Sequence, residues 1–97
     1  MVNDKMVNKV MTKQEIIDKT NEFLVEEYEK DLALLTPEAR LREDLDLNSL
    51  DYMDLMVTVK RVFDIMPAPA EMNLVVTLGD FYDFIEKILN EPAKTNE

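Results

Sequence analysis

The chain contains no cysteine, no histidine and no tryptophan, and it has a single glycine among its 97 residues. Without a thiol or an imidazole it can form neither a disulfide nor a Cys/His zinc site, and it lacks the nucleophile pairs in which histidine is the base. Its apolar runs span only a few residues, whereas a membrane-spanning helix needs about 20. A chain of this length has room for one domain with a modest core. These absences exclude most familiar catalytic sites, and we expect a protein that is not an enzyme.

Basic residues are also scarce, because 11 Lys and Arg oppose 21 Asp and Glu, for a formal net charge of −10. Such a charge repels the phosphate backbone of nucleic acids and attracts basic protein surfaces. The first residues lack the continuous apolar stretch and the cleavage site of a secretory signal. We therefore expect a cytoplasmic monomer that inserts into no membrane, binds no nucleic acid and meets partners through their basic surfaces.

The first of three predicted amphipathic helices follows Thr12, which forms a capping box with Glu15. Apolar positions then recur at three- and four-residue spacing as far as Tyr28. A long connection comes next, in which Thr36 followed by Pro37 predicts a short turn. We expect the leucines of this connection to pack inward: Leu32, Leu34, Leu35, Leu41, Leu45 and Leu47.

The second helix is predicted over residues 48–63, with Asn48 as its N-cap. Two apolar stripes run along it, and a small core has room for only one of them. The stripe expected to face the core consists of Tyr52, Leu55, Met56, Val59, Val62 and Phe63. The stripe expected to stay exposed consists of Leu50, Met53 and Val57.

Pro67 and Pro69 end this helix and permit a short helical turn over residues 70–73. Residues 74–77 are rich in β-branched side chains but too short for a sheet, so we expect a connection there. Thr77 then caps the last helix.

These elements predict an all-α fold, a small bundle of three main helices plus one short helix, with a long first loop. The expected domain covers residues 12–90. Flexible tails are expected at residues 1–11 and 91–97, since both ends are polar and unpatterned.

Serine is usually among the commonest residues, yet this chain has only Ser49. It lies at the predicted start of the second helix, within an acidic segment. A hydroxyl at a helix start is exposed, and the free N–H groups and the positive end of the helix dipole favour an attached phosphate. Serine is also a common N-cap, so its position alone allows either a modified or a purely structural residue.

The sequence around this serine resembles the phosphopantetheine attachment motif of acyl carrier proteins. That family has Asp-Leu-Gly-x-Asp-Ser-Leu, and residues 44–51 here read Asp-Leu-Asp-Leu-Asn-Ser-Leu-Asp. An acidic helix follows, with Asp54 and Leu55 in its middle and Phe63 at its end. The order of an acidic first helix, a long leucine-bearing loop, a short helix after the proline pair and a Thr-capped last helix also matches the family over residues 12–90.

The resemblance implies that Ser49 receives a 4′-phosphopantetheine arm from coenzyme A. A holo-acyl-carrier-protein synthase, or another phosphopantetheinyl transferase, would deliver the arm with the help of magnesium. The terminal thiol of the arm would carry acyl groups as thioesters, in fatty acid, polyketide or related secondary lipid biosynthesis. The other implied partners are acyl-transfer and ketosynthase-type enzymes.

The resemblance also implies roles for residues around the serine. Those expected to meet partner enzymes are Asn48, Leu50, Asp51, Met53, Asp54, Val57, Lys60 and Arg61. Those expected to line a cleft for a short acyl chain are Leu45, Tyr52, Leu55, Met56, Val59, Phe63, Phe84 and Ile88.

Several residues depart from the family pattern. Asn48 replaces the usual Asp before the serine, and Asp46 replaces the usual Gly three residues before it. Lys60 and Arg61 stand where carriers of primary fatty acid synthesis continue the acidic stripe, which favours a specialised carrier with dedicated partners. Cations also suit the last turn of a helix, so both explanations of this pair stay open.

Two other functions also stay open. Asp44, Asp46 and Asn48 match the first, third and fifth positions of an EF-hand calcium loop, although Leu55 stands where the bidentate Glu is required. Alternatively, the chain is a small acidic helical adaptor in which Ser49 stays unmodified. Its seven methionines favour the adaptor, because Met-rich surfaces accommodate several partners. The adaptor would bind through Leu50, Met53 and Val57.

Overall fold

The computed structural model describes residues 11–90, and within them every regular element is helical. The long helices are α2 (Lys13–Glu26), α3 (Ser49–Phe63) and α5 (Leu78–Asn90). They are joined by a single 3-10 turn, η1 (Leu32–Leu34), and by the short helix α4 (Pro69–Met72). The predicted all-α bundle of three main helices, one short helix and a long first loop is confirmed.

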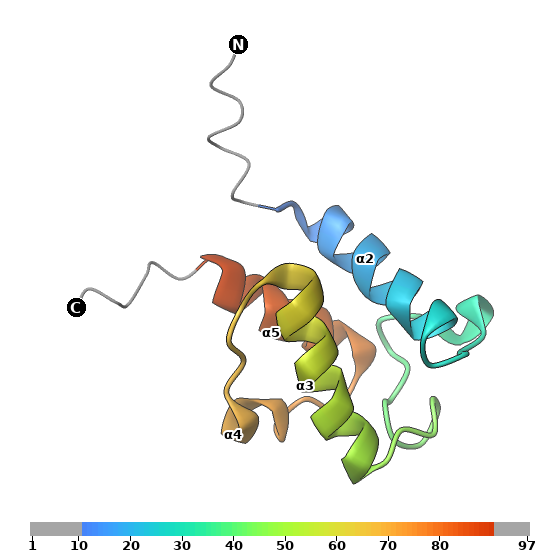
Figure 1. Ribbon diagram of the computed structural model, residues 1–97. Helices are drawn as coiled ribbons and strands as arrows, with labels where there is room; N and C mark the ends of the chain where they lie inside the picture. The colour runs from blue at the N-terminus through green and yellow to red at the C-terminus, as the bar shows by residue number, and fades with distance from the viewer. Residues whose placement is uncertain (1–10, 91–97) are drawn as a thin grey trace.

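The helices are arranged so that α5 packs against α2, while α4 packs against α3 and α5 (Figure 1). In this arrangement α4 lies beside the first half of α3, where the helix begins with Ser49. The tails predicted at residues 1–11 and 91–97 lie outside the described residues, except for Met11, which is partly buried against the core.

The helix starts follow the capping chemistry of the sequence. The Thr12 hydroxyl accepts a hydrogen bond from the Glu15 N–H at 3.1 Å, and the Glu15 carboxylate accepts one from the Thr12 N–H at 2.9 Å. At the start of α5, the Thr77 hydroxyl and Asp80 exchange the same pair of bonds, each of 3.1 Å. Each cap satisfies N–H groups of the first turn that have no partner inside the helix.

One continuous core joins the helices. Its central side chains come from all three long helices, α4 and the long loop, and each is at most 1% exposed: Ile16, Leu24, Leu41, Leu45, Leu55, Val59, Met72, Leu78, Phe81 and Ile85. Because the core-facing stripe of α3 is buried here, the helix presents its other stripe to solvent.

The long loop between α2 and α3 is packed for most of its length, but the prediction was wrong for two of its leucines. Leu35, Leu41, Leu45 and Leu47 are buried as expected. Leu32 and Leu34 are 62% and 50% exposed. They belong to η1, whose single turn is too short to turn both side chains inward together with Leu35.

The loop is held to the segment before α5 by a short antiparallel bridge between Arg40 and Thr77. The Leu41 N–H donates to the Val76 carbonyl at 2.9 Å, and the Leu78 N–H donates to the Ala39 carbonyl at 2.8 Å. The β-branched residues before α5 form a connection, as the sequence predicted, and the isolated bridge to the long loop is a feature that the sequence did not predict.

Candidate functional site

Ser49 is the first residue of α3 and is exposed. The cap of this helix is Asn48, whose Oδ1 accepts a hydrogen bond from the Asp51 N–H at 3.0 Å. In return, Asp51 Oδ2 accepts one from the Asn48 N–H at 2.9 Å. The Ser49 hydroxyl forms no hydrogen bond with any residue between 11 and 90. Because Asn48 performs the capping role, the serine hydroxyl is available for chemistry.

The backbone around Ser49 suits an attached anion. Asn48 occupies the Asp51 N–H, and the Asn48 carbonyl accepts from the Tyr52 N–H at 3.0 Å. The N–H groups of Ser49 and Leu50 have no acceptor in the part of the chain that the structure describes. Two unpaired N–H groups at the positive end of the α3 dipole would stabilise a negative group on the serine oxygen.

A pocket of about 350 Å³, which we call the Ser49 pocket, opens beside this hydroxyl. It lies between α4 and the first half of α3, and its lining residues are Arg42, Ser49, Tyr52, Met53, Met56, Pro69, Met72 and Asn73. Of the residues predicted to line an acyl cleft, only Tyr52 and Met56 do so. The others are packed into the core or lie away from this pocket: Leu45, Leu55, Val59, Phe63, Phe84 and Ile88.

Tyr52 and Arg42 form one wall of the Ser49 pocket. The guanidinium carbon of Arg42 lies 4.5 Å from the centre of the Tyr52 ring, a cation–π contact. The Tyr52 hydroxyl is buried and donates to the Val75 carbonyl at 3.2 Å. Burial raises the pKa of Tyr52 above its ordinary value, while the Arg42 charge acts in the opposite direction. Tyr52 thus stays protonated and fixed, and it holds the guanidinium beside the pocket.

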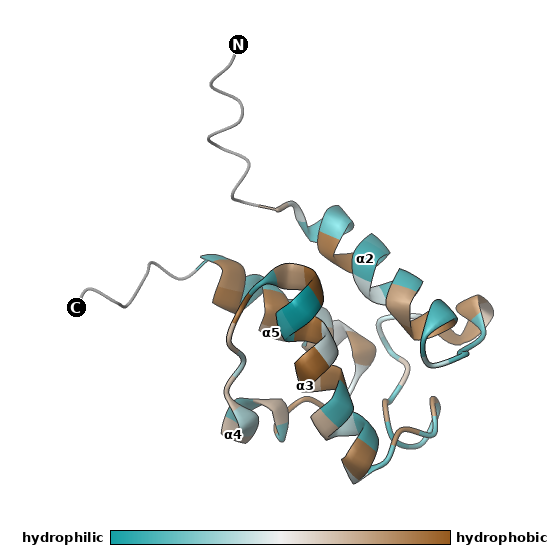
Figure 2. Ribbon diagram, viewed as in Figure 1, coloured by the Kyte–Doolittle hydropathy of each residue, from teal (hydrophilic) through white to brown (hydrophobic). Residues whose placement is uncertain are grey.

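The second apolar stripe of α3 is exposed, as predicted. Leu50 is 74% exposed, Met53 66% and Val57 63%. Hydrophobic colour predominates in the middle turns of α3, and a hydrophilic band interrupts it near the end of the helix (Figure 2). A smaller pocket of about 180 Å³, the Lys60 pocket, continues this surface and is lined by Met56, Val57, Lys60, Met66 and Pro67.

The two acidic residues in the first half of α3 form hydrogen bonds within the protein. Asp51 belongs to the capping box. Asp54 Oδ2 accepts a hydrogen bond from the Tyr28 hydroxyl at 2.7 Å, which ties the end of α2 to α3. Burial raises the pKa of Tyr28, so this hydroxyl remains a donor throughout the neutral range. Asp51 is partly exposed and Asp54 is exposed, so both carboxylates lie at the surface.

The two cations at the end of α3 have different surroundings. Arg61 Nη2 donates to both carboxylate oxygens of Glu27, at 2.8 and 3.0 Å. Lys60 is exposed, lines the Lys60 pocket and forms no ion pair within residues 11–90. Arg61 therefore joins α3 to the end of α2, whereas the Lys60 charge faces outward.

No protein-family model matches the chain. Acyl carrier protein 2 of Ralstonia nicotianae is 34% identical over 79 residues, which are 81% of this chain and 98% of the relative. The acyl carrier protein of Thermotoga maritima is 32% identical over 80% of this chain and 96% of the relative. That of an Exiguobacterium species is 30% identical over 78% of this chain and 96% of the relative.

The chain belongs to the acyl carrier protein family. It is accordingly a carrier and not an enzyme, as its lack of Cys and His led us to expect. Among the described residues, no helix is both long and apolar enough to cross a membrane.

The departure at Asp46 has a local explanation in this carrier. Asp46 adopts φ 56°, in the left-handed region that glycine enters without a steric cost. Asp is one of the few other residues that visits this region readily, because its short side chain can bond locally. The backbone turn before Ser49 therefore persists although the usual glycine is absent.

The EF-hand alternative loses the ligands it needs. Asp44 Oδ2 accepts from the Arg40 N–H at 2.8 Å, which holds the pKa of the Asp44 carboxyl below its usual range. Asn48 Oδ1 is used by the helix cap. No cluster of three or more potential metal-ligating side chains occurs between residues 11 and 90. These oxygens serve the backbone of the loop and helix start.

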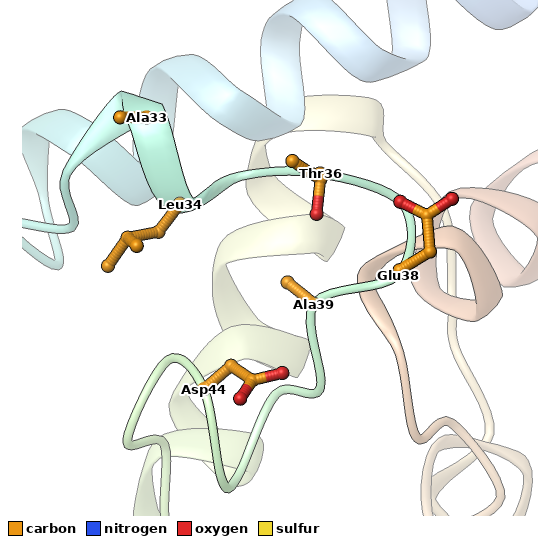
Figure 3. Close-up of a pocket in the computed structure, with 6 residues that line it drawn as sticks. All are labelled: Ala33, Leu34, Thr36, Glu38, Ala39 and Asp44. Carbon is orange, nitrogen blue, oxygen red and sulfur yellow. The ribbon is translucent and has the colours of Figure 1, made fainter.

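A second hollow of about 350 Å³ lies within the long loop (Figure 3). The loop itself supplies its walls: Ala33, Leu34, Thr36, Glu38, Ala39 and Asp44. It shares no lining residue with the Ser49 pocket, so we assign it no role in the carrier site.

Sequence reasoning missed several walls of the Ser49 pocket. Pro69 and Met72 belong to α4 and Asn73 is its C-cap; all three follow the far end of α3, and no local spacing links them to Ser49. Arg42 lies in the irregular loop, where periodicity carries no information about direction. The one sequence signal for these residues was the short helical turn predicted after Pro69, because such a turn has to pack against a longer helix.

Proposed function

We propose that this carrier bears a 4′-phosphopantetheine arm on Ser49 and moves acyl groups between enzymes as thioesters. The observation that carries the proposal is the exposed, unbonded hydroxyl of the only serine, at a helix start capped by its neighbour Asn48. A purely structural serine at such a place would normally supply the cap itself.

The residues present fit such an arm. The unpaired N–H groups of Ser49 and Leu50 suit its phosphate, and the Ser49 pocket offers mostly thioether and apolar walls to its chain. When bound, the arm supplies a terminal thiol to a protein that has no cysteine of its own. The attachment joins the Ser49 oxygen to the phosphate next to pantetheine in coenzyme A. The serine proton and adenosine 3′,5′-bisphosphate leave.

Partner enzymes would approach the face of α3 that follows Ser49. Leu50, Met53 and Val57 offer an exposed apolar stripe, while Asp51 and Asp54 give it negative charge. A phosphopantetheinyl transferase, acyl-transfer enzymes and ketosynthase-type enzymes with a basic, partly apolar surface would complement it. The cytoplasm is the compartment that we propose, on the sequence grounds given above.

The outward charge of Lys60 supports our proposal of a specialised carrier in fatty acid, polyketide or related lipid synthesis. Its outward positive charge ends the acidic surface one turn before α3 ends, and it would repel a basic patch positioned for a uniformly acidic helix. Arg61 contributes less to this selection because Glu27 neutralises it. Asn48 remains close enough to Ser49 to be covered by a bound transferase.

The test is modification of the purified apo-protein by coenzyme A and a transferase of broad specificity, followed by intact mass. We expect one phosphopantetheine per chain and none on Ser49→Ala, whose folding is checked by circular dichroism. A known acyl carrier protein in the same reaction shows that the transferase is active. If the control is modified and this protein is not, or if Ser49→Ala still gains the mass, the proposal fails. A protein that cannot be modified would favour the adaptor.

A further inference from the structure

Arg42 is the one cation that lines the Ser49 pocket. Its guanidinium lies over Tyr52, and the ring is fixed in turn because it is buried and its hydroxyl bonds to the Val75 carbonyl. A planar guanidinium stacked in this way keeps its N–H groups at its edge, where they can reach a ligand. The side chain is therefore positioned by the fold although it is exposed.

Two carboxylates near the start of α3 already have other partners, and the charge of Glu43, the chain neighbour of Arg42, acts on Tyr52 without an ion pair to Arg42. Asp44 accepts from the Arg40 N–H at 2.8 Å and lies 3.5 Å from the Arg40 guanidinium. Asp51 accepts from the Asn48 N–H. Within residues 11–90, Arg42 forms no ion pair with any acid. Arg42 is therefore a positioned cation beside Ser49 that no carboxylate of the described residues neutralises.

We infer that Arg42 binds the phosphodiester of the arm on Ser49 and thereby directs the arm into the Ser49 pocket; this inference rests on the proposed function. Guanidinium and phosphate form strong charge-assisted hydrogen bonds, and the planar fork of arginine suits two phosphate oxygens at once. Arg42 and Ser49 line the same pocket, so the cation and the phosphate would meet at its edge. The pairing also offsets the repulsion between the phosphate and the acidic chain.

This role assigns distinct tasks to the two arginines of the loop. Arg40 is held to Asp44 and to the bridge with Thr77, and it does not line the Ser49 pocket. Replacing either arginine with glutamine removes one positive charge from the same loop. Only Arg42→Gln removes a contact with the arm, so Arg40→Gln is a matched control for the general effect of charge.

The experiment compares apo and holo forms of the parent, Arg42→Gln and Arg40→Gln, each checked by intact mass. We expect the holo parent to melt about 4 °C above its apo form, because one exposed charged contact shifts a domain of this size by a few degrees. The gap should close in Arg42→Gln and persist in Arg40→Gln. High salt should also close it in the parent. Arg42→Lys keeps the charge without the planar fork, and we expect a smaller gap.

Phosphorus-31 NMR of the holo proteins gives a second readout that does not depend on stability. The phosphodiester resonance should move and sharpen in Arg42→Gln, because a released arm tumbles more freely, and stay in place in Arg40→Gln.

The outcomes separate the two proposals. If Ser49 gains no mass in the parent, the proposed function fails and the inference falls with it. If the holo forms are made but the melting gap and the resonance are the same in the parent and Arg42→Gln, the inference alone is overturned. The same holds if Arg42→Gln only slows modification, since Arg42 would then contact the transferase and not the arm.

Discussion

The contact between Arg61 and Glu27 gives a quantitative test of how the last turn of α3 is used. Arg61 Nη2 donates to both Glu27 oxygens, at 2.8 and 3.0 Å, but the two side chains remain 58% and 43% exposed. Exposed ion pairs contribute about 0.2–1 kcal/mol, and solvent screening keeps this pair within that range. Lys60 forms no such pair within residues 11–90. Both cations lie in the last turn of α3, where the helix dipole favours a positive charge.

The perturbation is a charge reversal at each position. Lys60→Glu loses only the dipole contribution, whereas Arg61→Glu also loses the pair and sets two carboxylates against each other. We expect Arg61→Glu to be less stable than Lys60→Glu by about 1 kcal/mol, or about 4–8 °C in Tm for a domain of this size. Adding Glu27→Arg to Arg61→Glu restores an ion pair with the partners exchanged and should recover most of the difference.

Urea unfolding at low salt measures these free energies, and the differences should shrink at high salt. The reasoning is refuted if both single reversals have the same stability, or if Glu27→Arg does not rescue Arg61→Glu. Acyl loading separates the functional role. Lys60→Glu should improve loading by a generic fatty acid acyl-transfer enzyme, while Arg61→Glu combined with Glu27→Arg should change it less.

Three further predictions concern stability. The Thr20 hydroxyl is buried without a hydrogen-bond partner among the described residues, so Thr20→Val should raise the free energy of unfolding by about 1 kcal/mol. Thr58→Val loses hydrogen bonds to Asp54 and Tyr28 and should lower it by about 1 kcal/mol. Urea unfolding would contradict this if both substitutions changed the free energy in the same direction. Glu29 has φ 56° in the turn that ends α2, so Glu29→Gly should raise the unfolding free energy by about 1 kcal/mol relative to Glu29→Ala, a matched loss of charge. The Thr77 and Val76 N–H groups lower the pKa of Asp80, so its contribution is present above the ordinary Asp pKa and is lost as pH falls through the lower folded value. The deficit of Asp80→Asn relative to the parent should therefore be greatest near pH 7 and close below about pH 4; a deficit that is constant with pH would refute it.

Much of the fold could be predicted from local sequence patterns. Thr12 with Glu15 and Asn48 with Asp51 form capping boxes because the cap and its third neighbour satisfy each other's N–H groups. The spacing of apolar residues on α3 divides its buried face from its exposed face, since a helix repeats every 3.6 residues. These features depend on neighbours within one turn, so no tertiary knowledge is needed.

The walls of the Ser49 pocket depend on tertiary packing and could not be predicted in the same way. Met72 reaches Ser49 only because α4 packs beside the first half of α3. The residues predicted to line an acyl cleft differ from the walls of this pocket for the same reason, because Leu55 and Val59 are buried in the core. Leu34 was expected to be buried because it is apolar, but the geometry of the short turn η1 leaves it exposed.

The central claim is that Ser49 carries the arm, and the most direct measurement is mass spectrometry of the protein isolated from the cells that make it. Fragmentation of the peptide that contains residues 44–54 locates any added group on a single side chain. We predict phosphopantetheine, free or acylated, on Ser49. Unmodified Ser49 throughout, in an extract whose other acyl carrier proteins are modified, would contradict the account.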